Sequence, residues 1–217
     1  MSQTDERAGG DEPITVYSDY VCPFCYLGRA SLGEYRETRE AELEIDWRPF
    51  DLRAQKRGPD GEIDRSVDDG KDEDYFDQVR ENVHRLREEY GAEEMLGIDE
   101  TPEVDSFDAQ VAARYVAEER PERWLDFDEA IFEALWVDGR DIGAADVLVD
   151  CAEAAGLDPD VVHRALDDDD LFARLDEQFG AAQRQGITGV PTFAYDGYAA
   201  RGAVPPDQLR RLFEGTD

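Results

Sequence analysis

Hydrophobic periodicity changes twice along this 217-residue chain, and this change constrains the fold more than any other feature. Near the N-terminus, residues 14–18 form a short apolar run, and residues 43–48 alternate apolar and polar side chains. Both patterns predict strands, and residues 23 to about 38 between them predict a helix. From residue 71 to 185, apolar side chains instead recur every three or four positions, which predicts a block of helices.

The C-terminal segment returns to strands. In PTFAYDGYAARGAV, the pair Asp196-Gly197 separates two β-prone runs, which is a strong signal for a hairpin. A short helix is expected after Pro205 and Pro206, because proline suits the first turn of a helix. The order of elements is therefore β-α-β, a helical block, and β-β-α.

This order predicts an α/β fold in which a four-stranded sheet is interrupted by a large all-helical insertion. We expect two lobes and not two successive domains. The sheet lobe comprises residues 13–57 and 186–217, and the insertion comprises residues 71–185. Residues 56–70 are polar and rich in glycine and aspartate, which indicates a loop between the lobes. Residues 1–12 lack an apolar stretch and predict a disordered tail.

The charge of the chain is strongly unbalanced, with 55 acidic and 23 basic residues and a formal net charge of −32. Only Lys56 and Lys71 are lysines, and the acidic residues are spread along the whole chain. Such a surface suits concentrated salt, because at about 1 M ionic strength the screening length falls to about 3 Å. Nucleic acid is excluded as a partner, since no basic stripe could neutralise phosphates.

Neither a signal peptide nor a membrane-spanning segment is evident in the sequence. We therefore expect a cytoplasmic protein with no membrane partner. Structural disulfides are rare in that compartment, so a closely spaced cysteine pair there indicates catalysis or metal binding.

Such a pair stands in the segment YVCPFCYLG, directly after the first predicted strand and at the start of a predicted helix. Three residues of helix place the α-carbons of Cys22 and Cys25 about 5 Å apart, within reach of a disulfide. Cys22 would face the unpaired N–H groups of the helix start, which stabilise a thiolate. Pro23 suits the first helical position. Cys25, one turn further, would resolve a mixed disulfide formed on Cys22.

A zinc site is the competing interpretation of the same pair. It would need further soft ligands, and the remaining thiol, Cys151, falls on an apolar helical face. His84 and His163 are far apart in the sequence and lie on predicted helices. We therefore expect no metal, and no cofactor other than the Cys22–Cys25 couple.

Two neighbours of the cysteines bear on their chemistry. Phe24 cannot add positive charge beside a thiolate, so we expect a couple that is less oxidising than a periplasmic oxidant. Asp19, three residues before Cys22, is a candidate proton relay to Cys25. A solvated or helix-capping carboxylate is the interpretation we favour for Asp19.

The segment GITGVPTF provides a candidate site for substrate. Val190-Pro191 precedes a predicted strand, a common setting for a cis peptide bond. A cis Pro191 would present the backbone of Val190 to an extended cysteine-containing peptide. An ordinary trans proline at the start of a strand is the alternative.

At these residues the chain resembles the thioredoxin-fold DsbA family, and in particular its cytosolic FrnE-like branch, in a halophilic archaeal type. The similar motifs are SDYVCPFCYLG, WRPFDL, GRDIG followed by AGLD, and GITGVPTF. The resemblance implies a thioredoxin-like fold with a helical insertion and thiol–disulfide exchange. It implies Cys22 as nucleophile, Cys25 as resolving thiol and Pro191 as the cis-proline, with Val190, Phe24 and Pro23 near the substrate.

Implied substrates are cysteine-containing proteins or low-molecular-weight thiols, and the oligomeric state stays open. The sequence departs from the family at Phe24, where many relatives have tryptophan, and at Gln110, where relatives often have histidine. Two alternatives remain. One is an enzyme similar to 2-hydroxychromene-2-carboxylate isomerases and kappa-class glutathione transferases, which typically carry serine at the position of Cys22. The other is a non-catalytic module that binds clients near Val190.

Overall fold

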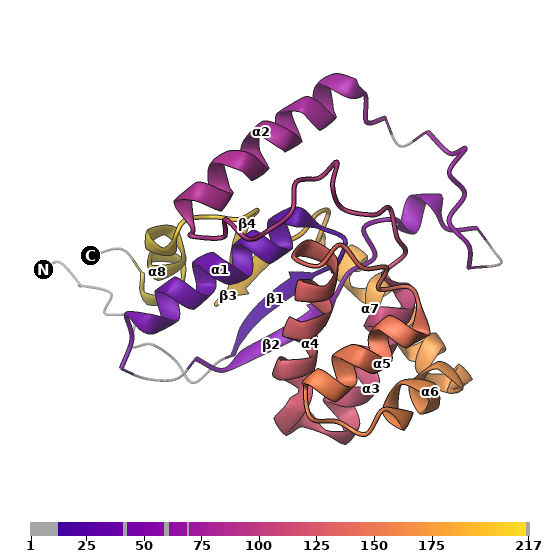
Figure 1. Cartoon of the computed structure of the whole chain (residues 1–217). Helices are drawn as coiled ribbons and strands as arrows, with labels where there is room; N and C mark the ends of the chain where they lie inside the picture. The colour runs from indigo at the N-terminus through magenta and orange to yellow at the C-terminus, as the bar shows by residue number, and fades with distance from the viewer. Residues whose placement is uncertain (1–12, 41–42, 59–60, 69, 216–217) are drawn as a thin grey trace, which may run out of the picture.

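The computed structural model describes residues 13–40, 43–58, 61–68 and 70–215 (Figure 1). The expected disordered tail, residues 1–12, lies outside this part of the chain. The strands are β1 (Ile14–Ser18), β2 (Ile45–Pro49), β3 (Thr192–Tyr195) and β4 (Tyr198–Arg201). The helices are α1 (Pro23–Glu37), the 3-10 helix η1 (Ala54–Lys56), α2 (Glu73–Glu89), α3 (Phe107–Glu119), α4 (Pro121–Trp136), α5 (Ala145–Ala154), α6 (Asp160–Leu166), α7 (Asp169–Arg184) and α8 (Pro206–Glu214).

The four strands form one mixed sheet in the order β2-β1-β3-β4, which confirms the predicted α/β class. β1 and β2 are parallel, as a strand–helix–strand unit requires, and β3 runs antiparallel to β1. The hairpin turns at Asp196 and Gly197, whose φ angles are 47° and 76°. Both are left-handed, the conformation for which the Asp-Gly pair is suited. β1 therefore lies in the middle of the sheet, and its end leads directly to the cysteines.

One face of the sheet is covered by α1 and α8 (Figure 1). Buried side chains from both helices meet those of β1 and β3 in a compact apolar cluster, which fixes the direction of α1. The main members are Ile14, Val16, Leu32, Phe193, Leu209 and Phe213. On the other face, Tyr17 of β1 packs with Phe50 and with Ala182 of α7.

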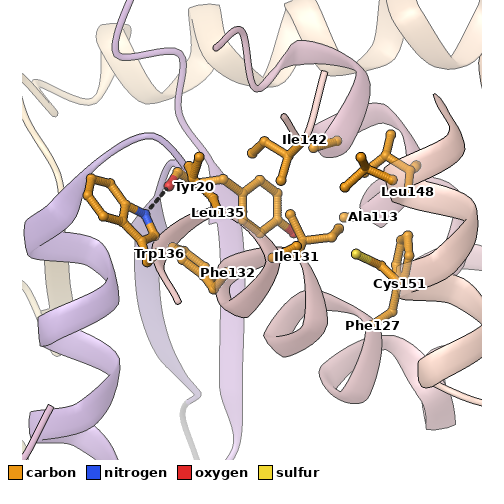
Figure 2. Close-up of a cluster of buried hydrophobic side chains, with 14 of the residues drawn as sticks. Tyr20, Ala113, Phe127, Ile131, Phe132, Leu135, Trp136, Ile142, Leu148 and Cys151 are labelled. Carbon is orange, nitrogen blue, oxygen red and sulfur yellow. Dashed lines mark hydrogen bonds between the residues drawn. The ribbon is translucent and has the colours of Figure 1, made fainter. Parts of the chain in front are cut away.

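The largest core lies among the helices of the inserted block and reaches the start of α1 (Figure 2). It includes Cys22 and Cys25. Trp136 at the end of α4 donates a hydrogen bond from Nε1 to the buried carbonyl oxygen of Tyr20 at 2.7 Å. The Tyr20 ring also contacts Phe132, with 4.8 Å between centroids. Helix α4 therefore holds the segment that carries the dithiol, and the helical core and the start of α1 pack together at the cysteines.

The segment after β2 is less irregular than the predicted loop. Arg57 forms an antiparallel bridge with Ile63, and its guanidinium binds two carboxylates. Nε donates to Asp51 at 2.8 Å, and the two terminal nitrogens donate to Asp105 at 2.7 and 2.9 Å. The same group lies 4.7 Å above the ring of Phe107. Arg57 thus joins the end of the sheet lobe to the start of α3.

Replacing Arg57 by glutamine should reduce the free energy of unfolding by about 3 kcal/mol, because the buried carboxylate of Asp51 loses its counter-charge. Chemical denaturation of both proteins measures this difference. Arg65→Gln is the control, since its side chain is exposed and its pair with Glu103 spans 3.9 Å. Equal losses in both variants would contradict the role given to Arg57.

Candidate active site at the start of helix α1

Cys22 occupies the N-cap position of α1, with extended backbone angles of φ −91° and ψ 114°. Its carbonyl oxygen accepts the first helical hydrogen bond, from the N–H of Cys25 at 2.9 Å. Pro23 fills the first turn, as the sequence predicts. The Cys22 side chain therefore lies at the positive end of a 15-residue helix, where anions are stabilised.

The Val190–Pro191 segment lies beside Cys22 in space, although Val190 is 168 positions away in the sequence. The peptide bond between the two residues is cis, as predicted, and Pro191 is buried. Cys22 Sγ donates a hydrogen bond to the carbonyl oxygen of Val190 at 3.3 Å. The Val190 carbonyl oxygen, which belongs to the segment proposed to hold substrate, is thus in direct contact with the Cys22 thiol.

Cys22 and Cys25 are both buried, and both thiols are free. The exposed fractions are 1% for Cys25 and 3% for Cys22. Burial raises the pKa of Cys25 well above its usual value, and the neighbouring Cys22 raises it further. The hydroxyl of Ser18 favours the Cys25 thiolate, although no hydrogen bond of normal geometry joins the two groups. Cys25 is therefore held as a neutral thiol one helical turn after Cys22.

Asp19 is buried, with 1% of its surface exposed, and Cys22, not Asp19, is the N-cap of α1, so the solvated or helix-capping carboxylate favoured from the sequence is wrong. Oδ2 accepts from the N–H of Leu52 at 2.8 Å. Oδ1 accepts from the hydroxyl of Ser106 at 2.6 Å and from Gln110 Nε2 at 3.4 Å. It also accepts from the N–H of Val21 at 3.2 Å. These partners come from three separate segments, which the sequence around residue 19 cannot indicate.

Burial raises the pKa of Asp19 to about 6, because water is excluded from the charged form. The bonds from Ser106 and the backbone oppose this shift without cancelling it. The side chain of Asp19 therefore exchanges a proton close to neutral pH. The backbone N–H of the same residue favours the thiolate form of Cys25.

The remaining predicted residues have less specific surroundings. Phe24 and Pro23 are half-buried, and Phe24 packs against the large core. Cys151 is buried, its Sγ lies 3.5 Å from the carbonyl oxygen of Ala130, and burial raises its pKa to about 11. His84 and His163 are exposed on α2 and α6. Within the described ranges, no three histidine, cysteine or acidic side chains gather as a metal site would require.

Gly28 is a residue that sequence reasoning missed. A Cβ atom there would lie 3.1 Å from Cγ of Pro191 and 3.3 Å from Cζ of Phe193. The glycine thus lets α1 approach the cis-proline segment closely. Its position could have indicated this contact, because an isolated glycine in a predicted helix, three residues after Cys25, often marks a place of close packing.

Replacing Gly28 by valine should lower the free energy of unfolding by about 1–3 kcal/mol, because the added methyl groups overlap Pro191. Displacement of Pro191 should also slow disulfide exchange. Gly33→Val is the matched control on the same helix, since no atom outside its chain neighbours and the helix backbone lies within 4 Å of the Cβ position there. If both variants unfold at the same denaturant concentration, close packing at Gly28 is not required.

Residues 13–214 match the family described as DSBA-like thioredoxin domain. The chain belongs to this family. The match covers both segments of the sheet lobe and the inserted helices, which confirms the thioredoxin-like fold. No helix among residues 13–215, apart from the short undescribed gaps, is long and apolar enough to cross a bilayer.

Individual relatives agree with this assignment. The chain is 29% identical over 200 residues to the protein YwbO of Bacillus subtilis (strain 168), covering 91% of this chain and 94% of YwbO. The crystal structure of a probable DsbA oxidoreductase, SCO1869 from Streptomyces coelicolor, matches with a TM-score of 0.69 and 23% identity over 94% of this chain and 91% of SCO1869. A 2-hydroxychromene-2-carboxylate isomerase matches with a TM-score of 0.68 and 22% identity over 93% and 92%. At these identities the structural matches show the shared fold.

Proposed function

We propose that this DsbA-family chain is a thiol–disulfide oxidoreductase that acts on cysteine-containing proteins or low-molecular-weight thiols. The observation that supports this function is the position of Cys22 at the start of α1, bonded to the Val190 carbonyl oxygen, with Cys25 one helical turn further on. The dithiol itself carries two electrons, so the reaction requires no bound cofactor. We assign the chain to the FrnE-like, halophilic branch within the family.

The reaction begins when Cys22, as a thiolate, attacks one sulfur of a substrate disulfide. The substrate S–S bond breaks, a new S–S bond joins Cys22 to the substrate, and the second substrate sulfur leaves as a thiolate. Cys25 then loses its proton and attacks Cys22. This step releases the other substrate sulfur and leaves a Cys22–Cys25 disulfide, so the substrate gains the two electrons that the dithiol loses. The reverse sequence oxidises a substrate dithiol.

The second step needs a base, because burial keeps Cys25 protonated. We assign this role to Asp19, whose pKa of about 6 leaves it mostly ionised at pH 7. The Ser18 hydroxyl beside Cys25 favours the developing thiolate. Pro191 is assigned the role of excluding a backbone donor from the thiols, and Val190 that of pairing with the substrate backbone.

An isomerase that uses a thiol cofactor is the second candidate, because the fold is shared with a 2-hydroxychromene-2-carboxylate isomerase. That reaction would not depend on Cys25. The presence of both cysteines, free and one helical turn apart at the start of α1, favours the dithiol enzyme.

Equilibration with glutathione redox buffers tests the proposal. Alkylation of free thiols followed by mass spectrometry gives the oxidised fraction at each potential. We expect one two-electron transition between the dithiol and a Cys22–Cys25 disulfide, at a potential less oxidising than that of a periplasmic oxidant. A protein that never forms this disulfide in oxidised glutathione would not be a dithiol enzyme.

We further propose that the chain works in cytoplasm with a high salt content. The net charge of −32 produces self-repulsion that salt screens. The melting temperature should therefore fall when KCl is reduced from 2 M to 0.1 M, as measured by scanning calorimetry. An unchanged melting temperature would remove the argument for salt adaptation.

A further inference from the structure

Gln110 is a buried polar residue to which the reaction proposed above gives no task. It lies in α3, and 4% of its surface is exposed. Ser106, the N-cap residue of α3, precedes it by four positions, so the two side chains lie on the same face of the helix. Both side chains donate hydrogen bonds to Asp19, which directly follows β1.

The polar groups around the Gln110 amide nitrogen fix the orientation of the amide. Nε2 donates to Oδ1 of Asp19 at 3.4 Å, to the carbonyl oxygen of Phe50 at 3.3 Å and to Oγ of Ser106 at 3.2 Å. The carboxylate and the carbonyl only accept, and Ser106 uses its own hydrogen to bond Asp19 at 2.6 Å. A reversed amide would place Oε1 against these acceptors, so the nitrogen must face Asp19.

The oxygen of the same amide has no partner. Gln110 Oε1 is buried and accepts no hydrogen bond from the described part of the chain. A buried acceptor without a partner destabilises a fold, so stability alone does not explain an amide at this position. The feature that distinguishes Gln110 from an apolar side chain of similar size is therefore the set of contacts made by its nitrogen.

The hydrogen-bond partners of the Asp19 carboxylate, among the described residues, are all donors. Oδ1 accepts from Ser106, from Gln110 and from the N–H of Val21, and Oδ2 accepts from the N–H of Leu52. Donors favour the ionised carboxylate, whereas a neutral acid would need an acceptor for its own proton. Burial acts in the opposite sense, and the pKa of Asp19 is about 6. The donors therefore help to keep a buried carboxylate available as a base.

Other titratable groups lie close to Asp19, but none of them titrates near pH 6 once Cys22 is blocked in a mixed disulfide. The charge of Asp51 raises the pKa of Asp19, and Asp51 is paired with Arg57 at 2.8 Å. Burial raises the pKa values of Tyr20 and Cys25 well above their ordinary values. Helix α3 contributes only uncharged partners, the two donors described above. A pH dependence of the second exchange step near pH 6 therefore reports on Asp19.

We propose that Gln110 is a positioning residue for the second exchange step: its amide nitrogen holds Asp19 as the carboxylate that takes the proton of Cys25. The inference rests on the oxidoreductase function proposed above. In this step the proton passes from Cys25 Sγ to Asp19, a new S–S bond joins Cys25 to Cys22, and the substrate sulfur leaves Cys22 as a thiolate. Gln110 acts on the step only through Asp19.

Reaction of the reduced Cys151→Ser protein with 5,5′-dithiobis(2-nitrobenzoate), followed by stopped-flow absorbance, tests the proposal. Cys22 releases one nitrothiobenzoate anion when it attacks the reagent, and Cys25 releases a second when it displaces the group held on Cys22. In Gln110→Met, the pH midpoint of the second phase should rise by about one unit, the effect of one lost hydrogen bond to a buried carboxylate. The second phase should then be about fivefold slower at pH 6 and nearly unchanged at pH 8. The first phase should not change.

Gln178→Met is the matched control. Gln178 is a half-buried glutamine of α7 whose Oε1 also lacks a partner within the described ranges, and it is not among the partners of Asp19. This variant should keep the midpoint of the parent protein. In an Asp19→Asn background, Gln110→Met should have no further effect on the pH profile. The carbon-13 resonance of the Asp19 carboxyl gives its titration without any disulfide exchange, and it should move with the second phase.

An unchanged carboxyl titration in Gln110→Met would overturn the proposal. A second phase that keeps its midpoint, or that slows equally at pH 6 and pH 8, would overturn it as well. A parent protein that releases only one nitrothiobenzoate anion would overturn the oxidoreductase function instead. The carboxyl titration would still decide in that case whether Gln110 holds Asp19 as a carboxylate.

Discussion

Replacing Cys22 by serine should reduce disulfide exchange at least about a thousandfold, because a hydroxyl at the helix start is not ionised at neutral pH and cannot attack a disulfide. Replacing Cys25 should have a different effect. In Cys25→Ser, Cys22 still attacks, but the mixed disulfide persists because the second thiol is missing. Steady-state reduction of insulin by dithiothreitol measures the first loss, and intact-mass spectrometry measures the trapped adduct.

Cys151→Ser is the control for both variants. Its thiol is buried on α5 with a pKa raised to about 11, so it has no part in exchange, and its removal should leave turnover unchanged. Turnover that survives in Cys22→Ser would eliminate the dithiol mechanism. If the protein converts a chromene substrate in the presence of glutathione, and Cys25→Ser does so at the same rate as the wild type, the isomerase function would be favoured.

The stability of the protein relative to an Asp19→Asn variant should depend strongly on pH. The folded-state pKa of Asp19 is raised to about 6 from an ordinary value of 3.8, so the folded state holds its proton more tightly than the unfolded state. Its contribution is fully present below pH 3.8 and is lost as the pH rises through 6. Between pH 4 and 8 the wild type should lose about 2–3 kcal/mol relative to Asp19→Asn. Urea denaturation at intervals of half a pH unit gives this difference.

Ser106→Ala provides a second arm of the same experiment. The Ser106 hydrogen bond lowers the pKa of Asp19, so its removal should move the transition to higher pH. The pH dependence of the exchange rate should move with it if Asp19 accepts the proton of Cys25. A difference between wild type and Asp19→Asn that is constant across this range would show that Asp19 does not titrate as described.

The parts of the fold that depend on local sequence were predictable. The apolar run before Cys22 and the alternation after Leu43 give β1 and β2, and the Asp-Gly pair gives the hairpin of β3 and β4. The position of Cys22 at the helix start and the cis Pro191 follow from their short motifs. In each case the interactions that decide the structure lie within a few residues.

The surroundings of Asp19 could not be predicted in the same way. Its partners Leu52, Ser106 and Gln110 lie 33, 87 and 91 positions away, and only the packing of α3 against the sheet brings them together. The approach of Gly28 to Pro191 likewise depends on the angle at which α1 crosses the sheet. Gln110 was noted as a departure from relatives, but its contact with Asp19 needed the tertiary structure.

The central claim is that Cys22 is the attacking thiol and Cys25 its shielded partner. Treatment of the folded, reduced protein with a sub-stoichiometric amount of iodoacetamide at pH 7, followed by peptide mapping, measures which sulfur reacts first. The account predicts label on Cys22 and almost none on Cys25 or Cys151. Label that appears first on either of those two, or that reaches Cys22 only after unfolding, would contradict it.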